Sequence, residues 1–169
     1  MWWSEGIVVQ GRRRLLAAGA LTLVAGCGFE LRKPPQMHFR TVMLQGFDSR
    51  SPMAEELRRS LATVAQVVTN PAEAQVVLES MADRREKSVV ASTTAGQVRE
   101  LQLRVRLQFR VVTPSGRELL QPDELLQWRD MSYNETNALA KEQEENQLYR
   151  AMQADIAAQV MRRLSTAKP

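Results

Sequence analysis

The sequence contains very few of the residues that catalytic and metal sites commonly use. It has one cysteine, Cys27, and one histidine, His38. A single cysteine excludes an internal disulfide, and a single histidine excludes a metal cluster built from these two residue types. A hydrolytic triad is equally unexpected, because the only histidine precedes the first predicted strand. No glycine-rich phosphate-binding loop is present either, so we expect no bound cofactor, no metal and no enzymatic activity.

Acidic residues occur as adjacent pairs, such as Glu55–Glu56, Asp123–Glu124 and Glu144–Glu145. Neighbouring residues on a helix or strand point apart, so these pairs do not form a general acid and base by spacing alone. We interpret them as solvated surface charge. A peptidoglycan-modifying enzyme would need a cleft with converging carboxylates, which this pattern does not predict.

The chain also lacks a strong excess of either charge. Its 23 basic and 19 acidic residues give a net charge of +4. Part of this excess, Arg12, Arg13 and Arg14 against Glu5, belongs to the segment before Cys27. The remaining chain is nearly balanced, so nothing resembles the basic stripe of a nucleic-acid-binding protein.

The apolar stretch Leu15–Gly26 is too short to span a bilayer, which takes about 20 residues. It follows Arg12–Arg14 and ends in Val24-Ala25-Gly26-Cys27. A basic start, a short apolar middle and small residues before the cleavage point are typical of a secretory signal peptide. We therefore predict that residues 1–26 are a signal peptide of the general secretion route.

The last four residues of this segment resemble the lipobox of bacterial lipoproteins, in which the cysteine thiol carries a diacylglyceryl group. We therefore predict that Cys27 is the lipid attachment site and the first residue of the mature protein. Two or three acyl chains give stable membrane anchoring. By the same resemblance, Gly28 in place of Asp favours the outer membrane. The alternative is an ordinary signal peptide with an incidental cysteine.

The mature chain predicts a short tether followed by one domain. Residues 27–39, with Pro34-Pro35, are expected to be extended. Residues 40–169 carry six predicted elements in the order β-α-β-β-β-α, namely a strand at 40–46, a helix at 52–65, a strand at 74–81 that resumes at 88–92, strands at 100–111 and 117–133, and a helix from about 136 to 164. The charged run Asp83–Lys87 is expected to interrupt the third element, and Thr93–Gly96 to form a hairpin tip.

The clearest of these segments is 100–111, in which apolar residues alternate strictly with polar ones. This alternation predicts a strand with one buried face, and Arg104, Arg106 and Arg110 lie on the other. The last helix repeats apolar residues every four positions, and its polar first turns are expected to project beyond the core. We predict an α+β fold, a two-layer sandwich with two helices packed on one face of a four-stranded mixed sheet.

Basic residues gather at two places in this predicted fold. Arg84, Arg85 and Lys87 lie near the long hairpin, and Arg99 follows its tip. Arginine matches phosphate and carboxylate groups well, so an anionic glycolipid is one possible ligand. The alternative is that these residues, like those of the strand at 100–111, only keep an exposed sheet soluble.

The sequence is similar to that of the LptE family, the lipoprotein subunits of the outer-membrane lipopolysaccharide translocon. The likeness spans residues 27–164 and is carried by the element order and three stretches, Cys27-Gly28-Phe29-Glu30-Leu31-Arg32, Asn137-Ala138-Leu139-Ala140-Lys141 with Leu148-Tyr149-Arg150-Ala151-Met152, and Gln159-Val160-Met161-Arg162-Arg163-Leu164. Glu30 and Lys33 depart from the commoner family residues.

The resemblance implies an outer-membrane lipoprotein on the periplasmic side that plugs the LptD β-barrel, helps it assemble and binds lipopolysaccharide. The family's ligand-associated lysine corresponds to Lys141. The basic hairpin-tip residue of some members has no match in Thr93–Gly96, which leaves Arg84, Arg85, Lys87 and Arg99 as the other candidates. The Arg104, Arg106 and Arg110 face would suit a polar barrel lumen. The alternative function is a periplasm-facing lipoprotein that carries or receives a lipid or lipoprotein in an apolar cavity.

Overall fold

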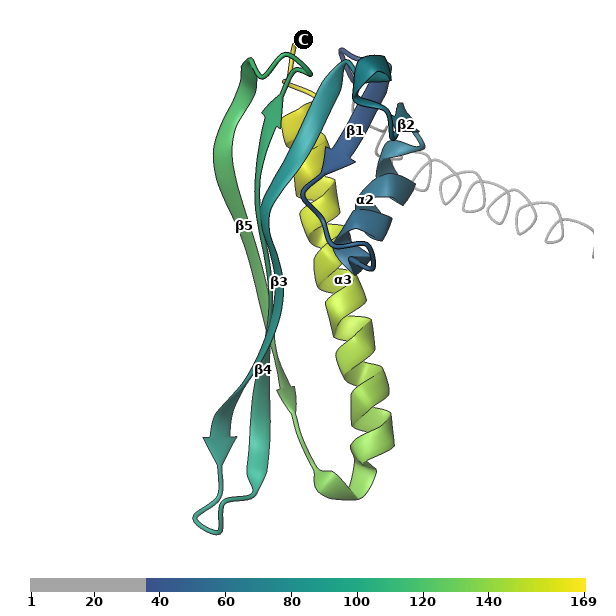
Figure 1. Ribbon diagram of the computed structural model, residues 1–169. Helices are drawn as coiled ribbons and strands as arrows, with labels where there is room; N and C mark the ends of the chain where they lie inside the picture. The colour runs from purple at the N-terminus through teal and green to yellow at the C-terminus, as the bar shows by residue number, and fades with distance from the viewer. Residues whose placement is uncertain (1–35) are drawn as a thin grey trace, which may run out of the picture. The chain divides into compact units, whose positions relative to one another are not determined.

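The computed structural model describes residues 36–169, which form one α+β domain (Figure 1). Its elements are β1 (Thr41–Gln45), α2 (Pro52–Leu61), β2 (Gln66–Val68), β3 (Val76–Ser92), β4 (Val98–Val112), β5 (Glu118–Ser132) and α3 (Ala138–Leu164). Single-turn helices η1 (Pro71–Glu73) and η2 (Glu135–Asn137) precede β3 and α3. The predicted signal peptide, Cys27 and most of the predicted tether lie outside the described residues.

The predicted two-layer sandwich is confirmed, but its sheet has five strands instead of four. The strand order is β2-β1-β3-β4-β5, with β1 parallel to β2 and β3, and with β3, β4 and β5 antiparallel. Both helices lie on one face of this sheet (Figure 1). We call that face inner and the opposite face outer. The additional strand, β2, has only three residues, too few for alternating polarity to reveal it.

Helix α2 begins where the sequence predicted and ends earlier. Ser51 caps its first turn by accepting the Ala54 N–H, and Pro52 occupies the first helical position. The helix ends at Leu61 and not at Ala65, because the chain turns there and the Gln66 N–H donates to the Arg40 carbonyl. Pairing with β1 therefore takes these residues out of the helix.

Strand β3 runs without a break through the charged run Asp83–Lys87, so the predicted interruption is wrong. Pairing with β4 satisfies the backbone of this stretch, and its side chains lie at half-exposed or exposed positions where charge is tolerated. The irregularity lies just before it. Ser80 pairs with Phe109 and Ala82 with Gln108, which leaves Met81 as the extra residue of a β-bulge.

The bulge reverses which residues of β3 face the helices. Before it, Val76, Leu78 and Ser80 are buried against the core. After it, the inward positions belong to Asp83, Arg85 and Lys87, which contact groups on the α2 cap and on α3. Residues of β3 with even numbers, including Arg84, therefore lie on the outer face beyond the bulge.

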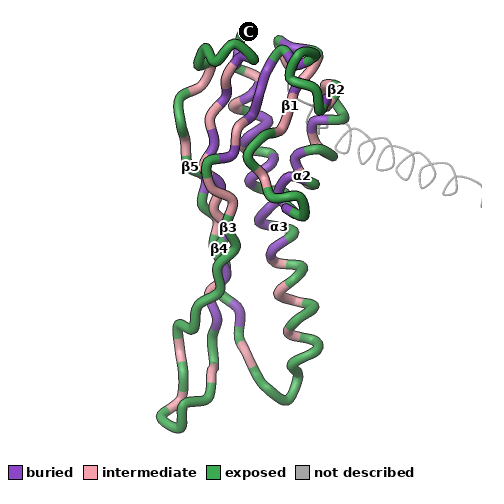
Figure 2. The backbone as a smooth tube through the Cα atoms, viewed as in Figure 1, coloured by how far each residue is buried: buried purple, intermediate pink, exposed green. Residues whose placement is uncertain are grey.

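Burial divides the domain into two regions (Figure 2). We call residues 86–104 and 128–148 the distal end, and the remaining described residues the main body. The main body holds most of the core, including Leu78, Phe109 and Ile156. In the distal end only Leu101, Leu103 and Met131 are buried. Burial along α3 begins at Tyr149, in agreement with the expectation that its polar first turns lie outside the core.

Candidate functional site

Lys141 lies in the first turn of α3, at the distal end of the domain. Its Nζ is 3.0 Å from the Ser132 Oγ at the end of β5 and 2.8 Å from a carboxylate oxygen of Glu144. The side chain is largely covered, and these two contacts hold it against the β5–α3 junction. The ammonium group of Lys141, which the family resemblance associates with ligand binding, is thus fixed in position.

Two other predicted basic residues lie at the same end. Arg99 is exposed at the start of β4, and its carbonyl accepts the Tyr133 N–H, which places it beside the β5–α3 junction. The Lys87 Nζ is 3.0 Å from a carboxylate oxygen of Glu145 on α3. The distal end therefore brings Lys87, Arg99 and Lys141 into one region, while Glu144 and Glu145 balance part of their charge.

Arg84 and Arg85 do not join this group, because they lie on opposite faces of β3. The Arg85 Nη2 donates to the buried Gln153 Oε1 at 2.8 Å, and its guanidinium lies 5.0 Å from the centre of the Tyr149 ring. Arg84 is exposed on the outer face and pairs across the sheet with Arg106. The four-residue cluster expected from the sequence is thus divided by the strand's own alternation.

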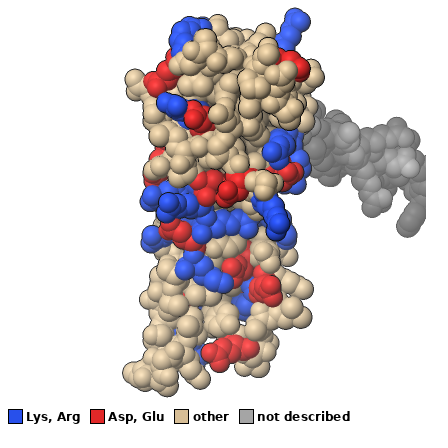
Figure 3. All heavy atoms as spheres, viewed as in Figure 1, with Lys and Arg blue, Asp and Glu red and all other residues tan. Residues whose placement is uncertain are grey.

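The outer face carries Arg104, Arg106 and Arg110, as the alternation predicted. The Arg110 Nε donates to Glu79 at 2.7 Å, and this hydrogen bond raises the pKa of the guanidinium. The Arg106 Nε lies 3.5 Å from Glu124, and Arg104 donates to Gln102. Charged side chains of both signs gather across the middle of the domain (Figure 3). The outer face is thus polar, with Arg110 and Arg106 close to acidic side chains and Arg104 bonded to an amide.

Two exposed apolar residues on the same face were not singled out from the sequence. Leu126 and Trp128 lie on β5, directly opposite Arg106 and Arg104, and are 45% and 53% exposed. The sequence signal for them was the adjacent pair Leu125-Leu126. Side chains of a strand alternate between its two faces, so only one member of such a pair can face the core. Leu125 is buried, so Leu126 faces outward.

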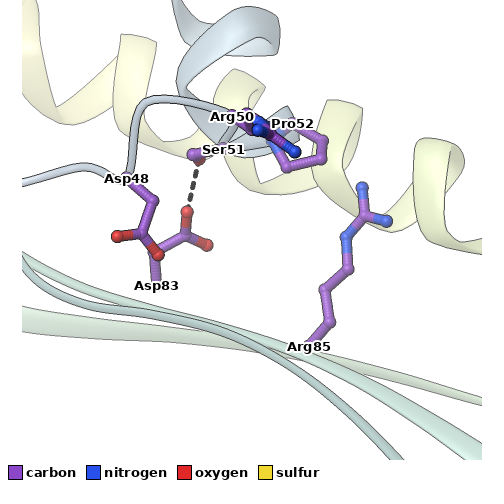
Figure 4. A pocket seen from close by; sticks show the side chains of 6 residues that line it. All are labelled: Asp48, Arg50, Ser51, Pro52, Asp83 and Arg85. Atoms are coloured by element: carbon purple, nitrogen blue, oxygen red, sulfur yellow. Dashed lines mark hydrogen bonds between the residues drawn. The ribbon is translucent and has the colours of Figure 1, made fainter.

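A polar cavity of about 200 Å³ lies between the start of α2 and β3 (Figure 4). Its lining includes Asp48, Ser51, Asp83 and Arg85. The Ser51 Oγ donates to Asp83 at 2.5 Å while it caps α2, so this contact joins the helix start to the strand after the bulge. We interpret the cavity as part of the packing between these elements.

A second cavity, of about 400 Å³, lies between β5 and the end of α3. It is lined by Phe109 and Leu120 but also by the ion pair of Asp123 with Arg163.

Within residues 36–169, no three potential metal-ligating side chains come together. In the same part of the chain, neither helix is long and apolar enough to cross a bilayer.

Comparison with known proteins identifies the family. A family model described as LptE, lipopolysaccharide-assembly, matches residues 39–164. The chain belongs to the LptE family. The LPS-assembly lipoprotein LptE of Pectobacterium atrosepticum is 27% identical over 151 residues, which cover 87% of this chain and 81% of the relative. The protein of the same name from Yersinia pestis strain Pestoides F is 28% identical over 156 residues, covering 90% and 74%.

Two solved lipoprotein structures show the same fold as this chain. Lipoprotein B from Nitrosomonas europaea superposes with a TM-score of 0.69 at 28% identity, covering 82% of this chain and 90% of that one. The rare lipoprotein B from Shewanella oneidensis gives a TM-score of 0.60 at 25% identity, covering 75% and 95%. The resemblance to LptE seen in the sequence is thereby confirmed, and a role in lipopolysaccharide assembly follows for the family.

Proposed function

We propose that this protein is an outer-membrane lipoprotein that occupies the lumen of an LptD-like β-barrel and supports its assembly. The observation that carries this proposal is the LptE family match over residues 39–164. The polar outer face of the sheet supports it, because the lumen of a large outer-membrane barrel is itself polar. Arg104, Arg106 and Arg110, each already placed near a polar side chain of the same sheet, suit such surroundings.

Membrane attachment in this proposal depends on acyl chains at Cys27. A lipid anchor at the start of the mature chain would leave the domain on the periplasmic side of the membrane, where the barrel lumen opens. Because anchoring by two or more acyl chains is stable, replacing Cys27 by Ala should release the protein into the soluble fraction. Mass spectrometry of the wild-type N-terminal peptide should detect a diacylglyceryl-modified cysteine, and an unmodified thiol would contradict this part of the proposal.

Lipopolysaccharide binding is assigned in this proposal to the distal end. Lys141 and Arg99 flank the β5–α3 junction, and Lys87 lies near them on the inner face of β3. Phosphate groups of the glycolipid would offer Lys141 charge-assisted hydrogen bonds in place of its present contacts with Glu144 and Ser132. Arg84 lies on the other face and is left out of this site, and Arg85 is held by Gln153 and Tyr149.

The alternative of a lipid carrier is not favoured by the cavities described above. A carrier that shelters acyl chains needs an apolar interior, and burial of the charged Asp123 and Arg163 beside an acyl chain would be costly. Neither cavity offers a wall free of charged side chains. The plug proposal needs no internal cavity, because its contacts are made at the surface.

Co-purification tests the proposed function. The full-length protein, tagged at its C-terminus and extracted from membranes in mild detergent, should bring down one large β-barrel protein, LptD, in equal amounts. Recovery of the tagged protein with lipid and no barrel would favour the carrier, and recovery with neither would overturn both. A tagged lipoprotein of unrelated fold, extracted from the same membranes, controls for nonspecific recovery.

A further inference from the structure

The last strand of the sheet, β5, has one unpaired edge. Residues 123–132 pair with β4 in an unbroken register, from Asp123 opposite Phe109 to Ser132 opposite Glu100. No strand among residues 36–169 pairs with the other side of β5. A free edge of this length presents a row of backbone donors and acceptors to which another strand can add.

The backbone groups that face this edge can be identified. The Tyr133 N–H donates to the Arg99 carbonyl in the same register, so 99 and 133 form a hydrogen-bonded pair. Such pairs alternate along an antiparallel ladder, and residues with odd numbers between 123 and 133 therefore bond to β4. Those with even numbers direct both backbone groups away from β4. They include Leu126 and Trp128, whose side chains are exposed on the outer face.

The other free edges of the sheet are better protected. Strand β2 has three residues and is followed by Pro71. Beyond its short pairing with β1, β3 carries the charged run Asp83–Lys87, which discourages strand addition. The first part of β5 has an irregular register at Gln121–Pro122. Residues 123–132 contain neither proline nor lysine, and they form the longest regular stretch of free edge.

A second copy of this chain does not suit that edge. In a two-fold antiparallel pair, Leu126 can face Trp128 only in the register centred on Gln127. This register places Glu124 opposite Asp130 twice, and like charges directly opposite are destabilising. In the register centred on Leu126, Glu124 faces Trp128. In the register centred on Trp128, Leu126 faces Asp130. In both, an apolar side chain lies opposite an acidic one. The row of side chains instead fits a strand with basic residues at its ends.

We propose that β5 accepts an added strand from the partner barrel, an extended segment with apolar side chains opposite Leu126 and Trp128. Basic side chains of that segment face Glu124 and Asp130. The proposal rests on the proposed function, since it takes an LptD-like barrel as the partner. Backbone hydrogen bonds supply the affinity of such an addition, and the alternating side chains supply its specificity.

Hydrogen exchange of the purified complex tests this proposal. The outward amides of Leu126, Trp128 and Asp130 should exchange about tenfold or more slowly in the complex than in the free full-length lipoprotein. The amides of Gln127 and Arg129 already bond to β4 and serve as an internal reference. Failure to recover any barrel would overturn the proposed function together with this inference. A recovered barrel with unchanged exchange at the three outward amides would overturn strand addition alone.

Matched variants separate the backbone contribution from that of the side chains. Asp130→Pro removes an N–H that β4 does not use, whereas Asp130→Ala removes only the carboxylate. Recovery of the barrel should fall about tenfold further in the proline variant than in the alanine variant. Equal recovery, with both variants melting like the wild type, would overturn the proposal.

A third experiment tests the side-chain contribution, with a substitution on the free edge of β3 as its control. Trp128→Lys should reduce barrel recovery about tenfold, as for a buried aromatic anchor, and Val89→Lys on β3 should leave it unchanged. Val89 is 55% exposed, so the two substitutions begin from similar exposure. Sedimentation of the free lipoprotein should show a monomer. A dimer that Trp128→Lys dissociates would assign this edge to a second copy and overturn the proposal.

Discussion

The main body and the distal end of the domain share strands β3, β4 and β5 and helix α3, yet they are held together differently. In the main body, β3, β4, α2 and α3 contribute fully buried side chains such as Leu78, Leu57 and Ile156. In the distal end, β3 contributes no buried side chain, and its contacts with α3 are polar. Apolar burial therefore stabilises the first region, and hydrogen bonds and ion pairs position the second.

This difference follows from where the sequence places its charges. The bulge at Met81 turns Asp83, Arg85 and Lys87 toward the helices, so the inner face of β3 becomes polar beyond it. Exposed polar contacts contribute little net free energy, so the distal end should open more readily than the main body. Low local stability is common in segments that bind ligands.

The largest expected effect contrasts two core substitutions. Phe109→Ala in the main body should lower the free energy of unfolding by about 3–5 kcal/mol, because the ring is 1% exposed and its loss leaves a cavity. Leu101→Ala in the distal end should cost about 2 kcal/mol, since Leu101 is 7% exposed and lies in a thinner core. Urea denaturation measures both. Equal losses would remove the distinction between the two regions.

Two glycines provide a comparison at matched backbone conformation. Gly46 has φ of +80° and Gly96 has φ of +79°, both in the left-handed region. A Cβ at position 46 would lie 2.3 Å from the Ser80 carbonyl oxygen, while one at position 96 would meet nothing within 4 Å. Gly46→Ala should therefore cost about 3 kcal/mol and Gly96→Ala about 1 kcal/mol. Thermal melting tests the order, and a larger loss at position 96 would contradict it.

Tyr149 lies where the two regions meet. Its hydroxyl donates to the Glu86 carbonyl at 2.9 Å, so Tyr149→Phe should lower the free energy of unfolding by about 1 kcal/mol at neutral pH. The ring, and with it the contact to Arg85, is kept in this variant. Urea denaturation at pH 7 measures the change, and a variant as stable as the wild type would show that the hydrogen bond makes no net contribution.

The same residue predicts a dependence on alkaline pH. Burial raises the pKa of Tyr149 above its ordinary value of 10.0, so the folded state favours the protonated phenol. This contribution to stability is complete below pH 10 and is lost as the pH rises through the higher value of the folded state. Between pH 9 and pH 11, the wild type should lose more stability than Tyr149→Phe. Parallel pH profiles would contradict the shift.

The smallest effect is expected at an exposed ion pair of the distal end. Lys87→Met removes the contact with Glu145, and the free energy of unfolding should change by less than about 1 kcal/mol. The Lys87 side chain is 49% exposed, so water already screens this contact. High salt should reduce the difference between variant and wild type. A loss as large as that of Leu101→Ala would mean that ion pairs, and not apolar burial, stabilise this end.

The sequence predicted the elements whose polarity pattern is long and regular. The alternation at 100–111 and the four-residue spacing from Leu148 to Leu164 correspond to β4 and α3. The predicted α+β class followed from them and is confirmed, although the sheet has five strands and not the four predicted. Strand β2 could not be found this way, because its formation depends on pairing with β1 and not on its own three residues.

The arrangement of the basic residues was less accessible from the sequence. Whether Arg84 or Arg85 faces the helices depends on one extra residue at Met81, and adjacent charged residues carry no polarity pattern that marks their faces. Exposure of Leu126 and Trp128 likewise depends on the register between β4 and β5. Residue types therefore indicated which side chains were candidates, and strand pairing decided which of them lie together.

Binding of purified lipopolysaccharide by the full-length lipoprotein tests most directly whether the distal end is the ligand-binding region. Lys141→Gln combined with Arg99→Gln removes two distal cations, and Lys168→Gln combined with Arg162→Gln removes two exposed cations near the C-terminus. The distal pair should weaken binding about tenfold or more, because charge-assisted contacts to phosphate are lost, and the C-terminal pair should leave it unchanged. Equal affinities for the two double variants would contradict the assignment of this function to the distal end.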